Sequence, residues 1–155
     1  MINMRKGILL LMAILVSVYS RSQTLTVLNK SGSIVFLTVS GSSANKCDHK
    51  YSSVPIQAAP GSTKIFKTYS EITWSGKKPG NSFEYSCLSG MITDPSGACV
   101  SNTSNNIGTD KCRMKKIATI DLSKCTGIPG GLTVTWSSKG NDVTVTIESN
   151  IVSNQ

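Results

Sequence analysis

Residues 132–148 read LTVTWSSKGNDVTVTIE, and this stretch decides the fold class. Leu132, Val134 and Trp136 alternate with polar residues, and the alternation resumes at 143–148 after a polar break. A period of two residues is typical of a β-strand with one buried face. The break, 138–142, consists of residues that are common in turns. The stretch therefore predicts a β-hairpin with Trp136 in the core.

The other face of this hairpin carries threonine at four positions, which are Thr133, Thr135, Thr144 and Thr146. Flat threonine arrays can order water, so an ice-binding face is one interpretation. Such a face needs the array to continue over further strands, and the sequence contains no repeat that would supply them. Because threonine is common on half-exposed strands, the sequence favours an ordinary solvated face.

Strand patterns dominate the rest of the chain. Further strands are predicted at 24–29, 33–40, 54–58, 62–69, 71–74, 82–88 and 113–122. The first two flank Lys30, Ser31 and Gly32 and are expected to form a hairpin. Residues 41–53 and 89–111 are polar and are predicted as loops, and Pro55 favours an edge position for its strand.

These patterns predict an antiparallel β-sandwich of about seven to eight short strands, stapled by disulfides. A closed β-barrel is the alternative. No stretch after the first 22 residues shows a helical period of apolar residues.

The N-terminus has the pattern of a secretory signal peptide. Arg5 and Lys6 precede an apolar run at 8–19, and the small residues Ser20 and Ser22 come just before Gln23. Twelve apolar residues would span about 18 Å as a helix, which is too short for a hydrocarbon core of about 30 Å. We therefore predict removal of 1–22, a single mature domain at 23–155, and a secreted, extracellular or periplasmic location.

Five cysteines remain in the mature chain, namely Cys47, Cys87, Cys99, Cys112 and Cys125. In an oxidising compartment cysteines mostly pair, so the odd count predicts two disulfides and one thiol. Four of the five lie within 87–125, where we expect most of the pairing. The order of pairing stays open. Asn-x-Ser/Thr sequences at Asn29 and Asn102 are glycosylation sites only in a host that uses them.

No catalytic or metal-binding motif is recognisable. His49 is the single histidine, and it could form a thiol–imidazole pair with Cys47 if both faced the same side of an extended segment. A nucleophile would also need an orienting group and an oxyanion site. The sequence contains no GxSxG, HExxH, paired CxxC or EF-hand pattern. We therefore expect no enzyme activity, no cofactor and no metal site.

Two stretches are candidate binding surfaces. In ITWSGKKPGN, 72–81, Trp74 precedes a loop with Lys77 and Lys78, and an indole in such a setting can stack on a sugar or sit at a membrane interface. The alternative for Trp74 is a core or rim position at the end of its strand.

The second stretch is DKCRMKK, 110–116. If it is extended, Lys111, Arg113 and Lys115 share one face and form a basic strip. The alternative is a solvated edge that its charges protect from pairing.

Charge is consistent with an acidic partner. Loss of Arg5, Lys6 and Arg21 lowers the formal net charge from +8 to +5. The leading hypothesis is a secreted, non-enzymatic binding or interaction domain whose partner is an anionic polysaccharide, a cell-surface component or another protein. The alternative is a membrane-active or toxin-like protein acting on anionic lipid. A small hydrolase would depend on His49 alone. Nucleic acid is not expected for an exported protein whose basic strip at 110–116 has no aromatic platform nearby.

Overall fold

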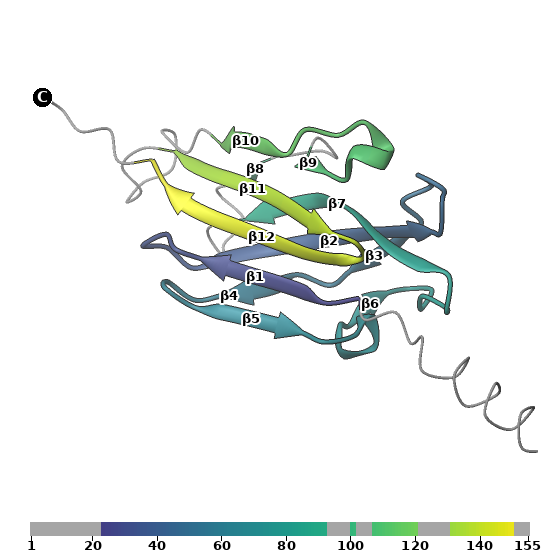
Figure 1. The fold of residues 1–155 in the computed structure, drawn as a ribbon. Coiled ribbons are helices and arrows are strands. Elements are labelled where there is room, and N and C mark those ends of the chain that lie inside the picture. The colour runs from purple at the N-terminus through teal and green to yellow at the C-terminus, as the bar shows by residue number, and fades with distance from the viewer. Residues whose placement is uncertain (1–22, 93–99, 102–106, 121–130, 151–155) are drawn as a thin grey trace, which may run out of the picture.

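The computed structural model describes residues 23–92, 100–101, 107–120 and 131–150. Their strands form two sheets that pack face to face as a β-sandwich, and they form no closed barrel (Figure 1). The predicted fold class is therefore confirmed. The predicted signal peptide, Cys99, Asn102 and Cys125 lie outside the described residues.

The first sheet has five strands. In spatial order these are β10 (Ile117–Ile120), β11 (Leu132–Lys139), β12 (Asp142–Ser149), β1 (Leu25–Asn29) and β5 (Thr63–Phe66). The predicted hairpin at 132–148 is present as β11 and β12, and its turn is made by Gly140, which has a φ of 63°, and Asn141. All neighbours are antiparallel except β1 and β12, which run parallel.

The second sheet has seven strands. Its main order is β6 (Trp74–Ser75), β3 (Tyr51–Ser53), β2 (Val35–Ser43), β7 (Phe83–Ile92) and β8 (Val100–Ser101). Two short strands are attached to it, β4 (Ile56–Ala58) beside β2 and β9 (Ile107–Gly108) beside β7. Two 3₁₀ turns, η1 (Tyr69–Glu71) and η2 (Asp110–Cys112), lie in the connections.

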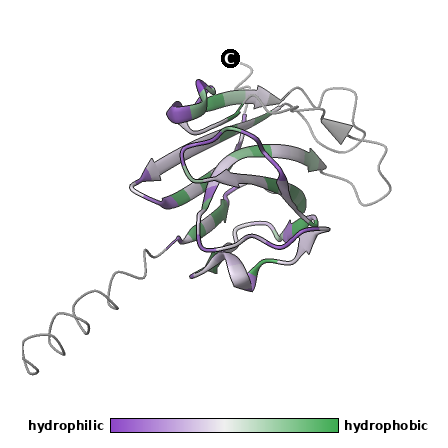
Figure 2. Ribbon diagram, turned by 90° about the vertical axis from the view of Figure 1, so that its right-hand side faces the viewer, coloured by the Kyte–Doolittle hydropathy of each residue, from purple (hydrophilic) through white to green (hydrophobic). Residues whose placement is uncertain are grey.

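The core lies between the two sheets and follows the predicted alternation. Leu132, Val134 and Trp136 are at most 1% exposed. The facing layer comes mainly from β2 and β7, including Leu37, Phe83 and Leu88. Figure 2 shows the apolar segments on the strands of both layers and polar segments at many of the turns.

The prediction of a hairpin at residues 24–40 is wrong. β1 pairs with β12 and β5 in the first sheet, whereas β2 pairs with β3, β4 and β7 in the second. The chain therefore crosses from the first sheet to the second after β1, and the buried side chain of Asn29 hydrogen-bonds within this crossover and to the end of β4. Its Nδ2 donates to the carbonyl oxygens of Ser33 and Ala58, and its Oδ1 accepts from the backbone and hydroxyl of Ser31.

Other boundaries also differ from the sequence prediction. The predicted loop at 41–53 contains the end of β2 and all of β3, and the predicted strand at 71–74 begins only at Trp74 because 69–71 form η1. The predicted strand at 113–122 starts at Ile117.

A disulfide joins Cys47 to Cys112 across a sequence separation of 65. Only one end of this bridge, Cys112 in η2, lies in the interval 87–125 where most pairing was expected, and its partner Cys47 lies in the loop after β2. Cys87 is a buried thiol in β7.

Candidate functional site

A hollow of about 310 Å³ lies where η1, β6 and the loop after β6 meet. We call it the Trp74 hollow. It is lined by Tyr69, Ser70, Glu71, Ile72, Thr73, Trp74, Lys78 and Pro79. The structure therefore brings two of the predicted binding residues, Trp74 and Lys78, to one concave surface. Tyr69 and Pro79 add partly exposed apolar area to it.

Local hydrogen bonds fix the wall of this hollow. The indole Nε1 of Trp74 donates to the carbonyl oxygen of Tyr69 at 2.8 Å, which ties β6 to η1. The Glu71 carboxylate accepts from the backbone amide of Lys67 at 2.9 Å and closes the turn. The carboxylate is exposed, so it can still reach a ligand.

Aromatic packing explains why Trp74 is only 9% exposed. The Phe83 ring lies 5.0 Å from the Trp74 ring and 5.2 Å from the Tyr69 ring, measured between centroids. Trp74 is therefore placed in the core at the end of its strand, as the alternative interpretation expected, and it forms the floor of the hollow rather than an exposed platform. The partly exposed ring beside it belongs to Tyr69, which the sequence analysis did not select.

Lys77 and Lys78 are exposed. The ion pairs among the described residues are Lys30–Glu148, Lys50–Asp48, Lys111–Glu84 and Lys116–Asp110. In that part of the chain, then, neither Lys77 nor Lys78 forms an ion pair, although the exposed Glu71 carboxylate lines the same hollow as Lys78.

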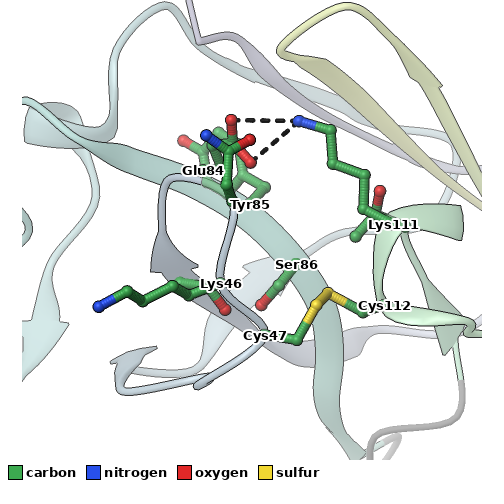
Figure 3. A pocket seen from close by; sticks show the side chains of 10 residues that line it. Lys46, Cys47, Glu84, Tyr85, Ser86, Lys111 and Cys112 are labelled. Carbon is green, nitrogen blue, oxygen red and sulfur yellow. Dashed lines mark hydrogen bonds and ion pairs between the residues drawn. A yellow bond between two sulfur atoms is a disulfide. The ribbon is translucent and has the colours of Figure 1, made fainter.

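A second hollow, of about 330 Å³, lies beside the disulfide, and we call it the disulfide hollow (Figure 3). Its charged lining residues are Lys46, Glu84 and Lys111. Lys111 Nζ lies 3.1 and 3.2 Å from the two carboxylate oxygens of Glu84. This pair cancels most of the positive charge that Lys111 would offer to an anion.

The predicted basic strip does not form as an extended face. Lys111 lies in η2, and Arg113 follows it in the left-handed conformation with a φ of 56°. Lys115 precedes β10, and all three side chains are exposed. The strand pattern failed here because Cys112, fixed by its disulfide, belongs to a helical turn.

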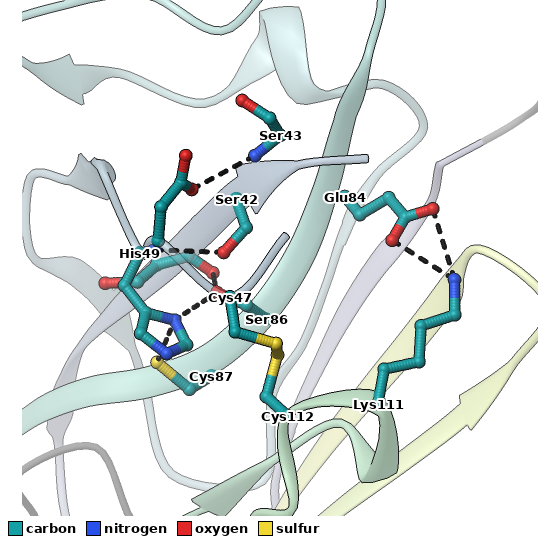
Figure 4. Close-up of a disulfide and its surroundings, with 11 residues drawn as sticks. Ser42, Ser43, Cys47, His49, Glu84, Ser86, Cys87, Lys111 and Cys112 are labelled. Carbon is teal, nitrogen blue, oxygen red and sulfur yellow. Dashed lines mark hydrogen bonds and ion pairs between the residues drawn. A yellow bond between two sulfur atoms is a disulfide. The ribbon is translucent and has the colours of Figure 1, made fainter. Parts of the chain in front are cut away.

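His49 has different neighbours from those considered in the sequence analysis (Figure 4). Cys47 is oxidised, so a Cys47–His49 pair does not exist. Instead, Nδ1 of His49 lies 2.8 Å from Ser86 Oγ and 3.6 Å from Cys87 Sγ. No sequence signal could have found this contact, because β7 lies 37 residues further along the chain.

The side chains beside His49 belong to a buried hydrogen-bond network. Ser86 Oγ lies 3.2 Å from the Ser40 carbonyl oxygen as well as 2.8 Å from Nδ1 of His49. Burial raises the pKa of the Cys87 thiol, although hydrogen bonds with Ser86 and Ser40 act in the opposite direction. Both groups are at most 1% exposed. No group of three or more His, Cys, Asp or Glu side chains that could hold a metal ion occurs among the described residues.

No family model, curated protein or solved structure matches this chain. Within the ranges that the structure describes, no helix has the length and apolar character needed to cross a membrane.

Proposed function

We propose that the protein is a secreted binding domain that takes an anionic saccharide at the Trp74 hollow. The observation that carries this proposal is the meeting of an aromatic ring, hydroxyl groups and a lysine on one concave surface. Tyr69 offers its ring to the apolar face of a sugar, and Ser70 and Thr73 offer hydroxyls to its polar edge.

Lys77 and Lys78 outnumber Glu71, the one carboxylate that lines the hollow, and this excess of positive charge favours an acidic sugar over a neutral one. Lys78 lines the hollow and Lys77 is its neighbour in the exposed loop. A carboxylate or sulfate on the saccharide would give these ammonium groups a partner. The disulfide hollow is the weaker candidate, because its Lys111 is already paired with Glu84.

Binding of the mature chain to heparin, alginate and neutral dextran, measured by titration calorimetry at low and at moderate salt, tests the proposal. The Lys77→Gln/Lys78→Gln variant should bind the acidic polysaccharides about tenfold more weakly, which equals about 1.4 kcal/mol. Its affinity should also depend less on salt.

The matched control is Lys64→Gln/Lys139→Gln, which removes the same charge from exposed positions outside the hollow. Equal losses in both variants would show that only net charge matters and would contradict the assignment. Binding to anionic vesicles but to none of the polysaccharides would assign the lysines to lipid headgroups instead.

A further inference from the structure

The outer face of the first sheet carries a threonine array that is wider than the hairpin pattern indicated. β11 and β12 contribute Thr133, Thr135, Thr144 and Thr146, whose exposure is intermediate. The strand register adds Thr26 from β1, Thr63 from β5 and Thr119 from β10. All five strands therefore place threonine on one face, although the sequence contains no repeat. We call this surface the threonine face.

The register orders these side chains into rows that cross the strands. One row runs through Ile117, Thr135, Thr146, Leu28 and Thr63. The next runs through Ser137, Thr144, Thr26 and Ile65. Neighbouring strands lie about 4.8 Å apart, and residues two apart along a strand lie about 6.8 Å apart. Six of these nine positions carry a hydroxyl group, and the other three are Ile117, Leu28 and Ile65. On β11 and β12 the hydroxyl groups fill both rows, so they repeat in two directions there.

These two rows contain no charged residue. Charged residues flank the rows at both ends of the hairpin: Lys139 and Asp142 are partners beside the row of Ser137 and Thr144, and Glu148 bridges to Lys30 at 2.9 Å beyond the other row. Ile65 and Ile117, at the two edge strands, are each 58% exposed. Natural exposed sheets usually carry lysine or glutamate, so nine adjacent uncharged positions are unusual for a solvated surface.

Chemistry excludes several partners for this face. Without charge it does not select an anion, and without an aromatic ring it has no platform for a sugar. The two rows cover about 20 Å by 15 Å, or roughly 300 Å², which is well below the roughly 800 Å² per partner that a stable dimer buries.

We propose that the threonine face binds ice. Each threonine offers a hydroxyl that can donate to and accept from water, and a methyl group that holds adjacent water in place. Thr133 donates its hydroxyl to the Asn150 side chain. Among the described residues, the other six threonines of the face make no side-chain hydrogen bond, so their hydroxyls remain available to water. The hydroxyl groups that repeat in two directions on β11 and β12 would match a partner that is itself a lattice of hydrogen-bonding groups, and ice is such a lattice.

The test uses the mature chain labelled with a fluorophore at its amino terminus. An ice crystal grown slowly in its solution should incorporate the label, and the gap between melting and freezing temperatures should exceed that of a buffer containing an equal mass of albumin. Thr144→Lys/Thr146→Lys, at the centre of the face, should abolish both signals.

Gln57→Lys is the matched control, because Gln57 is an exposed strand residue of the second sheet and gains the same kind of side chain. It should keep both signals. Far-UV circular dichroism and a urea melt establish whether each variant is folded. If the lysine variant does not fold, the milder variant Thr144→Ser/Thr146→Ser replaces it. That serine variant should weaken both signals, because it removes only the methyl groups.

Several outcomes would overturn the proposal. The wild-type chain could be excluded from ice with no freezing gap, or the threonine-face variants could behave like Gln57→Lys. A concentration-dependent dimer that the same variants dissociate would assign the face to a second copy. Ice binding and saccharide binding are tested independently, because the Lys77→Gln/Lys78→Gln variant should still be incorporated into ice.

Discussion

Asn29 joins the end of β1 to the second sheet through its side chain. It is 0% exposed, and its amide group hydrogen-bonds two stretches of chain, the connection at 31–33 and the end of β4 at Ala58 and Ala59. The folded protein does not present this amide to solvent, so glycosylation of the Asn29 sequence would be incompatible with the folded contacts. The Asn-x-Ser pattern identifies an acceptor sequence but does not indicate whether its asparagine is buried.

We expect Asn29→Ala to lower the free energy of unfolding by about 3 kcal/mol or more. The substitution removes several hydrogen bonds and leaves buried partners unsatisfied, each at about 1–3 kcal/mol. Urea denaturation measures the loss. Asn81→Ala, at an exposed asparagine, should stay within about 0.5 kcal/mol. Similar midpoints for the two variants would show that the Asn29 network contributes little.

Tyr85 is a buried residue whose hydroxyl has no hydrogen-bond partner among the described residues. Burial raises the pKa of this hydroxyl, and the negative charge of Glu71 raises it further. The unfolded chain therefore ionises Tyr85 near pH 10, whereas the folded chain keeps it neutral to higher pH. Its contribution to stability is complete below about pH 10 and is lost as the pH rises above that value.

Tyr85→Phe should leave stability at pH 8 unchanged or raise it by up to about 1–3 kcal/mol, because an unsatisfied hydroxyl is removed. The variant should also lose stability less steeply than the wild type between pH 10 and 11. Urea melts across this range measure both effects. A variant that is clearly less stable at pH 8 would show that the hydroxyl has a partner in solution.

At the scale of elements, β2 and β7 approach closely at a glycine. A Cβ atom on Gly41 would lie 1.8 Å from the ring of Phe83, which is the centre of the aromatic cluster behind the Trp74 hollow. The absence of a side chain at Gly41 therefore lets this cluster pack against the sheet.

Gly41→Ala should lower the free energy of unfolding by about 1–3 kcal/mol or more, as overpacked core variants do. It should also weaken saccharide binding, because Phe83 supports Trp74 and Tyr69. Gly80→Ala is the control, since nothing lies within 4 Å of its Cβ position. A denaturant melt and a binding titration compare the two. Equal stability would mean that Phe83 moves aside without cost.

Local elements could be predicted from the sequence, and contacts between distant segments could not. The hairpin at 132–148 was predictable because both strands and their turn lie within 17 residues. The partners of β1 were not, because a two-residue period identifies a buried face without saying which strand lies beside it. Trp74 shows the same limit at the site. Its neighbours in sequence suggested a loop, whereas its burial comes from Phe83, nine residues later in another strand.

At the scale of the molecule, the Cys47–Cys112 bridge closes a long loop. A chain-entropy model gives about 4 kcal/mol for a loop of this size. Cys47→Ser/Cys112→Ser should be less stable by about that amount in a urea melt. Peptide mapping without reduction should find the bridge, and thiol counting in denaturant should find one thiol per chain. Five thiols would contradict the prediction of an oxidising compartment.

Because β1 pairs with β12, one contact of the first sheet can form only after almost all of the described chain has been synthesised. The first strand of the domain takes its place between β5 and the last strand, so this seam joins residues that are more than 100 positions apart. During synthesis β1 is made before β12. Until β12 has been made, β1 can pair only with β5. Because contacts of such high sequence separation slow folding, we expect refolding in milliseconds to seconds rather than microseconds. A chain that stops before Asp142 would keep every described strand of the second sheet yet lack β12, the central strand that joins β11 to β1 in the first sheet.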